Sequence, residues 1–210
     1  MVTVEVDPVR VESRLAAGEI GCPDCGGVLG GWGHARARRI AGLADPVRPR
    51  RARCRACAVT HVLLPVTMLL RRAYAAERLW AALTSRAEGL GHRQIGTSLG
   101  VPATTVRGWL RRAAGRLEAI RSWFLGVAVT AGVDVAIPDA MGCAWRDMLA
   151  AVSTASASIR FRFGAIGLGR AVTPELVAVA ASGGRLLAPG WPPPRSWPAA
   201  TRIAPDAGTG

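Results

Sequence analysis

The sequence predicts a mainly α-helical fold with a small β module at its N-terminal end. Two Cys-x-x-Cys pairs near the N-terminus, apolar residues at helical spacing after them, and a proline-rich end support this order of segments. A chain of 210 residues suits one or two small domains. We divide it into a lead-in (1–19), a cysteine-bearing β module (20–66), a three-helix unit (67–122), a C-terminal helical region (123–187) and a proline-rich disordered tail (188–210).

The two cysteine pairs are separated by 28 residues. Two thiolates that lie two residues apart in a tight turn can face one ion, and two such turns complete a tetrahedron around Zn²⁺. In a reducing compartment this pattern indicates metal rather than disulfides, and free cysteines or a redox pair account less well for two matched pairs. The sequence therefore predicts a four-cysteine zinc ribbon with structural zinc on Cys22, Cys25, Cys54 and Cys57.

Two histidines lie close enough in sequence to act as alternative ligands. His34 and His61 could each replace one thiolate, but we favour a place beside the ligands or at the surface. Gly26 and Gly27 help the first cysteine pair to turn, whereas the second pair is followed by the less typical Ala58.

The segments around the cysteine pairs are expected to form short strands. Trp32–Ile40 and Val47–Arg53 read as the arms of a hairpin, with Gly42–Asp45 as the turn and Thr60–Leu64 as a third strand. Residues 1–19 read as a short edge strand and then a short helix or turn. Such a small module cannot bury enough apolar surface to be stable alone. Zinc would supply on the order of 10 kcal/mol or more.

Positive charge is concentrated in one part of the chain. Eighteen of the 27 basic residues, all of them arginine, lie between Arg36 and Arg121, against only four acidic residues. A localised basic block indicates a polyanionic partner, although arginine in place of lysine can also reflect a GC-rich genome. Arg51, Arg53 and Arg55 alternate and so share one face, which is either a solvated rim or a phosphate-binding stripe.

A helical pattern begins after Pro65. Leu79, Trp80, Leu83 and Ala87 recur at helical spacing and predict the first helix of a three-helix unit, ending at Gly89–Gly91.

Residues 92–112 read as two short helices joined by a tight turn. Gly100 suits the left-handed C-cap of the first helix, and Pro102 suits the start of the second. Ile95 belongs to the inward stripe of the first helix, and Gly96 leaves that helix without a side chain where the second would cross it.

The second of these helices has an apolar face and a polar face. Val106, Trp109 and Leu110 would point inward. The pattern resembles the helix-turn-helix of bacterial DNA-binding proteins, in which this helix, about 102–113, would read a groove. The alternative is an ordinary helical hairpin in a core. The expected DNA-binding residues are Ala103, Thr104, Arg107, Gly108, Arg111, Arg112 and Arg93.

The reading helix is expected to continue past this motif. Apolar residues alternate spacings of four and three along Val106, Leu110, Ala113, Leu117, Ile120, Phe124 and Val127. We favour packing against the following helices over a dimeric coiled coil, because each glycine in this stretch costs a lone helix about 1 kcal/mol.

The C-terminal half is apolar and carries few charges. Asp139–Phe163 reads as one helix, and Thr173-Pro174-Glu175 reads as the N-terminus of another that runs to about Ala181. The apolar run 123–137 is shorter than the ~20 residues that span a membrane, and the N-terminus lacks a signal-peptide pattern. We therefore expect a cytoplasmic, nucleoid-associated protein.

A wider resemblance covers residues 20–121. The motifs CPDCGG, RRARCRAC, THVLLP and GHRQIGTSLGVPATTVRGWLRR are similar to the zinc-ribbon and helix-turn-helix module of bacterial insertion-sequence transposases. They look closest to an actinobacterial domain-of-unknown-function family with the same two modules. The resemblance implies DNA binding and structural zinc. It departs from transposases after Ser122, where fewer than 90 residues remain in place of a large nuclease.

These patterns lead to one functional expectation and two alternatives. We expect a sequence-specific DNA-binding protein without nuclease activity, either a transposase-derived regulator or a targeting subunit, whose partner is double-stranded DNA. A recombinase or a second copy of the chain is a possible protein partner, and no membrane or small-molecule substrate is expected. The alternative is a zinc-ribbon adaptor for protein or RNA. A shortened transposase with nuclease activity fits less well, because its acids are widely spaced.

Overall fold

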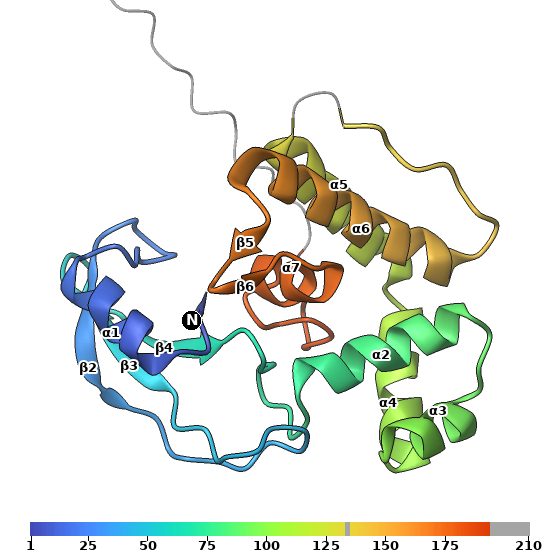
Figure 1. The fold of residues 1–210 in the computed structure, drawn as a ribbon, viewed down its shortest axis with the longest axis horizontal. Helices are drawn as coiled ribbons and strands as arrows, with labels where there is room; N and C mark the ends of the chain where they lie inside the picture. The colour runs from blue at the N-terminus through green and yellow to red at the C-terminus, as the bar shows by residue number, and fades with distance from the viewer. Residues whose placement is uncertain (133–134, 194–210) are drawn as a thin grey trace, which may run out of the picture.

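The computed structural model describes residues 1–132 and 135–193, in which a four-stranded sheet with one helix is followed by six further helices (Figure 1). The elements run in the order β1 (Val2–Val4), α1 (Pro8–Ala16), β2 (Leu29–His34), β3 (Arg50–Cys54), β4 (Thr60–Pro65), α2 (Ala76–Ala87), α3 (His92–Leu99), α4 (Ala103–Ala114), α5 (Leu117–Ala131), α6 (Ala144–Phe163), β5 (Ile166–Gly167), β6 (Arg170–Ala171) and α7 (Pro174–Ala181).

The sheet has the strand order β1-β4-β3-β2. β2, β3 and β4 pair antiparallel, and β1 adds to β4 in parallel. The predicted hairpin and third strand are confirmed in outline, but the predicted bounds of the first arm are wrong. β2 covers Leu29–His34, and beyond it the pairing continues through the Ala35 N–H, which donates to the Pro49 carbonyl at 2.8 Å, and an isolated Arg38–Val47 bridge. Pro49 lies in the return arm and Pro46 directly before it, and neither can donate to a ladder, which explains the interruption.

α1 closes one face of the sheet. Asp7 caps the helix, with its carboxylate accepting from the Val9 N–H at 2.9 Å, and Pro8 occupies the first helical position. Val11 and Leu15 are the buried residues of α1. They form a small core with residues of all four strands, including Val4, Leu29, Ala52 and Leu63.

α3 and α4 are joined by a three-residue turn, as predicted. Gly100 takes the left-handed conformation (φ 61°) that ends α3, and α4 begins directly after Pro102. A Cβ on Gly96 would lie 2.8 Å from the Val101 carbonyl oxygen and 3.2 Å from the Ala103 Cα. The missing side chain therefore sets how closely the two helices approach.

The prediction of one long helix from α4 onward is wrong. α4 ends at Ala114, and α5 begins at Leu117 after Arg116 leaves helical geometry (φ −142°). The Arg116 guanidinium donates to the carbonyls of Ala188 (2.6 Å) and Trp191 (2.9 Å), so a distant segment stabilises this break. The apolar seam is mostly buried inside this chain, in agreement with intramolecular packing; its buried members include Leu110, Ala113, Leu117, Ile120 and Phe124.

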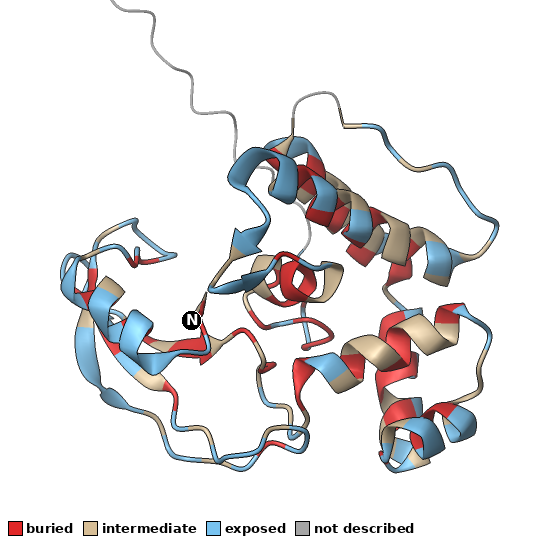
Figure 2. Cartoon of the chain, viewed as in Figure 1, coloured by how far each residue is buried: buried red, intermediate tan, exposed pale blue. Residues whose placement is uncertain are grey.

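The C-terminal helices share one large core with α2, α3 and α4 (Figure 2). α5 and α6 pack side by side. α6 begins at Ala144 rather than at Asp139, since Gly142 precedes it in a left-handed conformation (φ 67°). The start of α7 is confirmed, with Thr173 capping the Leu176 N–H at 3.1 Å and Pro174 at the first position.

α7 connects the two halves of the molecule, because it contacts β1 on one side and both α2 and α6 on the others (Figure 1). Ala188 and Trp191, early in the proline-rich segment, are buried. The predicted disorder of the tail is therefore wrong for these two residues, which pack into the large core, whereas residues 194–210 lie outside the described part. Among the described residues, no helix has the length and apolar character that a membrane crossing requires.

Candidate functional site

The structure brings the four cysteines of the two Cys-x-x-Cys pairs together. Their sulfur atoms all lie within 4.8 Å of one another, with Cys22 Sγ 3.8 Å from Cys57 Sγ and Cys25 Sγ 3.5 Å from Cys54 Sγ. Zn–S bonds of about 2.3 Å place tetrahedral sulfurs about 3.8 Å apart. The cluster, next to the sheet, could therefore hold a metal ion such as zinc.

Two matching turns present the sulfurs. In the first, the Gly26 N–H donates to the Cys22 carbonyl at 2.9 Å, and in the second the Ala58 N–H donates to the Cys54 carbonyl at 3.1 Å. The residue after each pair is left-handed, with φ 73° at Gly26 and 61° at Ala58. Ala58 therefore holds a conformation that glycine adopts without strain, and the departure noted in the sequence is a real local cost.

A glycine also allows the two turns to meet. A Cβ on Gly27 would lie 2.8 Å from the Cβ of Ala56 and 3.1 Å from Cys54 Sγ. Gly27 thus serves the close approach of the two turns, in addition to the turn that the sequence indicated.

The electrostatics of the cluster favour a cation. The backbone N–H of Cys57 donates to Cys54 Sγ at 3.5 Å, and together with the N–H of Ala56 it lowers the pKa of Cys54 to about 6. Although the Val59 N–H favours its thiolate, the sulfurs of Cys25, Cys54 and Cys22, together with burial, raise the pKa of Cys57 to about 12. Thiols this close cannot all ionise without a positive ion between them, and a divalent metal supplies that charge.

His61 lies beside the cluster. It is buried on β4, with its Nε2 3.3 Å from Cys22 Sγ and its Nδ1 2.8 Å from the amino nitrogen of Met1. Asp24, which the sequence reading did not single out, places a carboxylate oxygen 3.8 Å from the same Nε2. His34 is exposed and does not join the cluster. His61, Asp24 and Cys22 form a second group whose ligand atoms lie within 4.8 Å of one another, so both roles given to His61, a ligand or a residue beside the ligands, stay predictions.

The predicted DNA-facing residues of α4 are on its solvent side. Thr104, Arg107 and Arg111 are exposed and fall on one face of the helix, while Val106 and Trp109 are buried on the other. Ala103 and Gly108 are partly exposed, and Arg93 and Arg112 are exposed. Their contact with DNA stays a prediction.

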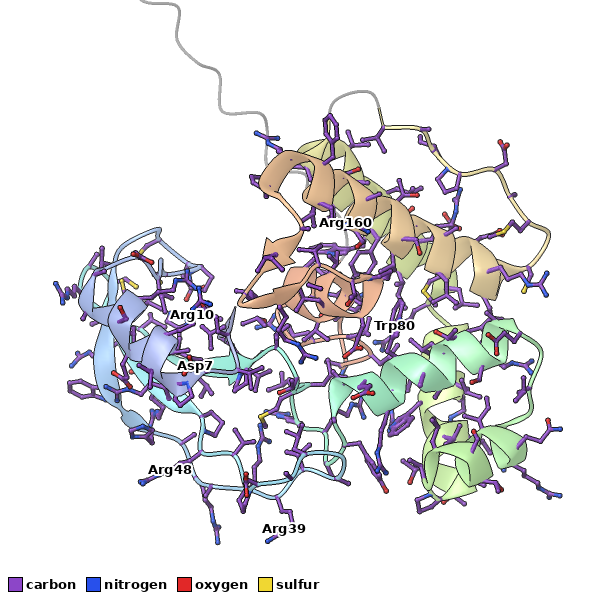
Figure 3. The ribbon with its side chains drawn as sticks, in the orientation of Figure 1. Asp7, Arg10, Arg39, Arg48, Trp80 and Arg160 are labelled. Atoms are coloured by element: carbon purple, nitrogen blue, oxygen red, sulfur yellow. The ribbon has the colours of Figure 1, made fainter. Side chains whose placement is uncertain are left out.

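The ribbon arginines are also at the surface. Arg51 and Arg53 alternate with the buried Ala52 and Cys54, and Arg55 follows them, likewise exposed. Arg53 donates to the Ala58 carbonyl at 3.1 Å, and its guanidinium lies 4.8 Å from the ring centre of the exposed Trp32. Arg39 and Arg48 extend from the loop between β2 and β3, away from the sheet (Figure 3). A phosphate-binding role for this stripe, or its alternative as a solvated rim, stays a prediction.

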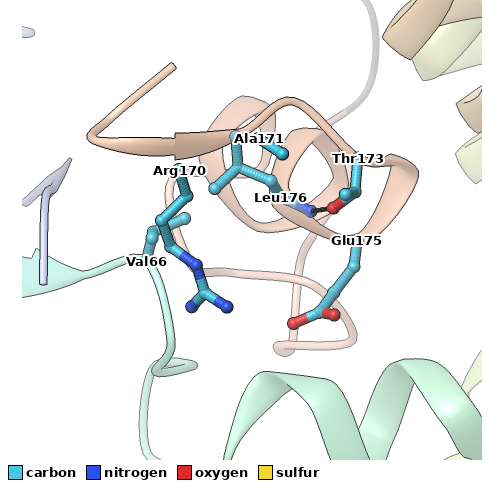
Figure 4. Close-up of a pocket in the computed structure, with 6 residues that line it drawn as sticks. All are labelled: Val66, Arg170, Ala171, Thr173, Glu175 and Leu176. Atoms are coloured by element: carbon cyan, nitrogen blue, oxygen red, sulfur yellow. Dashed lines mark hydrogen bonds between the residues drawn. The ribbon is translucent and has the colours of Figure 1, made fainter. Parts of the chain in front are cut away.

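A separate cavity of about 230 Å³ lies beside α7 and is lined by Val66, Arg170, Ala171, Thr173, Glu175 and Leu176 (Figure 4). Burial and then the nearby Glu77 raise the pKa of Glu175, while Arg170 opposes the shift. Among the described residues, no cysteine, histidine or second acid lines this cavity, so its lining does not supply a metal-ligand set.

Comparison with known proteins leaves the function to be argued from the geometry. No family model matches the chain, and neither a curated protein nor a solved structure shows significant similarity to it.

Proposed function

We propose that this chain is a zinc-stabilised, sequence-specific DNA-binding protein that acts without nuclease activity. In this proposal the four-cysteine cluster is the zinc site of a zinc ribbon, and α2, α3 and α4 form a helix-turn-helix unit whose α4 enters the major groove. A transposase-derived regulator or a targeting subunit is the role that follows from such a unit.

The observation that carries the proposal is the surface of α4. Arg107 and Arg111 are exposed one turn apart on a helix whose opposite face is anchored by Val106, Trp109 and Leu110 in the core. A rigid helix with exposed arginines suits the groove, since a guanidinium can donate two hydrogen bonds to the O6 and N7 atoms of guanine. The close α3–α4 crossing at Gly96 fixes the direction in which α4 points.

Zinc has a structural role in this proposal. Cys22, Cys25, Cys54 and Cys57 would hold it, and the bound ion would fix the two turns against each other and so stabilise β2, β3 and β4. The chain's own contribution is the pair of N–H groups that hold Cys54 as a thiolate and the His61 ring that contacts Cys22.

The absence of nuclease activity is part of this proposal, and the small number of acids in the C-terminal region motivates it. Two-metal chemistry needs carboxylates gathered around the ions. Asp147 accepts a hydrogen bond from the Met141 N–H at 2.7 Å, and Glu175 lines the cavity beside α7. Within residues 1–132 and 135–193, neither acid belongs to a cluster that could hold a metal ion.

Selection of bound duplexes from a random pool tests the proposal. The zinc-loaded protein should enrich a defined sequence, and its affinity for that duplex should fall with salt by roughly 0.9 log units per log unit of salt for each phosphate contacted. Arg107→Ala should cost about 1–3 kcal/mol on the selected site. Arg160→Ala is the matched control, since it removes an exposed charge from α6 (Figure 3). Absence of duplex binding at low salt would refute the proposal.

A second candidate is binding of single-stranded RNA by the ribbon. The exposed Trp32 with Arg53 over its ring offers a surface on which an unpaired base could stack. A single-stranded RNA pool in the same experiment distinguishes the two. Trp32→Ala would abolish RNA binding in this case and leave duplex DNA binding unchanged under the first proposal.

A further inference from the structure

An arginine-lined pocket of about 410 Å³ lies where the β4–α2 connection, the end of α4 and the segment after α7 meet. Arg71 and Arg72 come from the connection, Arg112 from α4 and Arg185 from the last segment. Leu70 and Trp191 also line the pocket. Three segments that are far apart in sequence thus bring four guanidinium groups to one cavity.

Within residues 1–132 and 135–193, the positive charge of this pocket is not compensated. No carboxylate lines it, and none of its four arginines forms an ion pair with another residue in the described part of the chain. Like charges in a shared, partly desolvated space repel one another, and an anion removes that repulsion.

The guanidinium of Arg72 is only partly hydrogen-bonded. Its Nη2 donates to the Leu187 carbonyl at 2.6 Å, but its Nε is buried without a hydrogen-bond acceptor. Burial, and then the charge of Arg112, lower the pKa of Arg72. A buried donor with no acceptor is costly, and such groups are rare unless a ligand or water completes them.

The backbone around the pocket is strained as well. Arg71 (φ 56°) and Leu187 (φ 59°) are two of the few non-glycine residues with left-handed geometry. Arg71 lines the pocket, and Leu187 supplies the carbonyl that holds Arg72. Strain of this kind gathers at ligand sites, where it orients side chains in advance.

We propose that this pocket binds a phosphate group. Guanidinium groups match phosphate oxygens with paired, charge-assisted hydrogen bonds, and a phosphate would neutralise Arg112 and Arg185 while offering an acceptor near Arg72. The volume lies within the range of small-ligand sites. The phosphate belongs either to a small phosphorylated molecule or to a DNA backbone that reaches the end of α4. The inference goes beyond the proposed function, since a small phosphate would bind even if the chain does not bind DNA.

The test is calorimetric titration of the full, zinc-loaded chain with inorganic pyrophosphate. Wild-type protein should bind it at one site, and Arg185→Gln should weaken binding about tenfold or more, the loss of a charged hydrogen bond. Arg160→Gln, an exposed arginine outside the pocket, should leave the affinity within about twofold. Arg185 is exposed, as Arg160 is in the control, so neither substitution should disturb folding. Arg72→Gln is a second variant, and its binding is compared once its thermal melting matches that of wild type.

A duplex titration distinguishes the two sources. Pyrophosphate binding that depends on Arg185, with the same duplex salt dependence in Arg185→Gln and wild type, identifies a small phosphorylated ligand. A duplex salt dependence that loses about one phosphate contact in Arg185→Gln identifies the DNA backbone, whether or not pyrophosphate binds. Pyrophosphate binding that is equal in Arg185→Gln and Arg160→Gln would overturn the inference. So would absence of pyrophosphate binding together with an unchanged duplex titration.

Discussion

A single methyl group at Gly96 tests the packing that holds α4 in place. Its Cβ would lie 2.8 Å from the Val101 carbonyl oxygen and 3.2 Å from the Ala103 Cα. Both neighbours are backbone atoms of the turn into α4, so neither can move aside by a side-chain rotation. Overpacking of this kind costs about 1–3 kcal/mol. Alanine gains about 1 kcal/mol over glycine in a helix, which offsets part of the loss. We therefore expect Gly96→Ala to destabilise the protein by up to about 2 kcal/mol.

The matched control is Gly108→Ala, also inside a helix. A Cβ there meets only the end of the Arg112 side chain, at 3.5 Å. This variant should therefore stabilise the protein by up to about 1 kcal/mol. Thermal melting of the zinc-loaded proteins measures both, at roughly 2–4 °C per kcal/mol for a chain of this size. A Gly96→Ala protein that melts at or above wild type would refute the close α3–α4 crossing.

Three further predictions concern the metal cluster and α7. Ala58→Gly should raise the melting temperature by the equivalent of about 0.5–1 kcal/mol, because it relieves the left-handed strain at that residue; a lower value would contradict this. Metal uptake at pH 7.5 should release protons, among them that of Cys57, whose pKa is about 12. Affinity should therefore fall as pH falls, most steeply below pH 6, where Cys54, with its pKa lowered to about 6, also takes up a proton. Calorimetry in two buffers measures the proton release, titrations from pH 5 to 8 measure the affinity, and equal affinity over that range would contradict the prediction. Thr173→Ala should cost about 1 kcal/mol in urea unfolding through loss of the α7 cap, and an unchanged midpoint would show that the cap is dispensable.

Local signals in the sequence predicted local structure well. Cys-x-x-Cys turns, a glycine and a proline around 100–102, and a threonine followed by proline at 173–174 each act over a few residues. Their geometry follows from backbone preferences that need no distant partner. The same holds for the solvent face of α4, where the apolar stripe decided which side is buried.

Contacts between distant segments could not be predicted. Leu117 and Ile120 keep the spacing of the seam across the break at Arg116, so the pattern looked like one helix. The break depends on carbonyls at Ala188 and Trp191, which no local pattern indicates. The parallel pairing of β1 with β4 and the arginine pocket likewise arise from tertiary packing.

The hydrogen bonds from Arg72 and Arg116 to the segment after α7 affect how the chain is made. They span 115, 72 and 75 residues. While a ribosome is still synthesising residues 187–191, Arg72 and Arg116 lack these carbonyl acceptors. Contacts between segments so far apart in sequence form slowly. We expect an arrest-peptide fusion to register folding force only after Trp191 has left the exit tunnel, whereas a signal from residues 1–122 alone would show that α2, α3 and α4 fold without this closure.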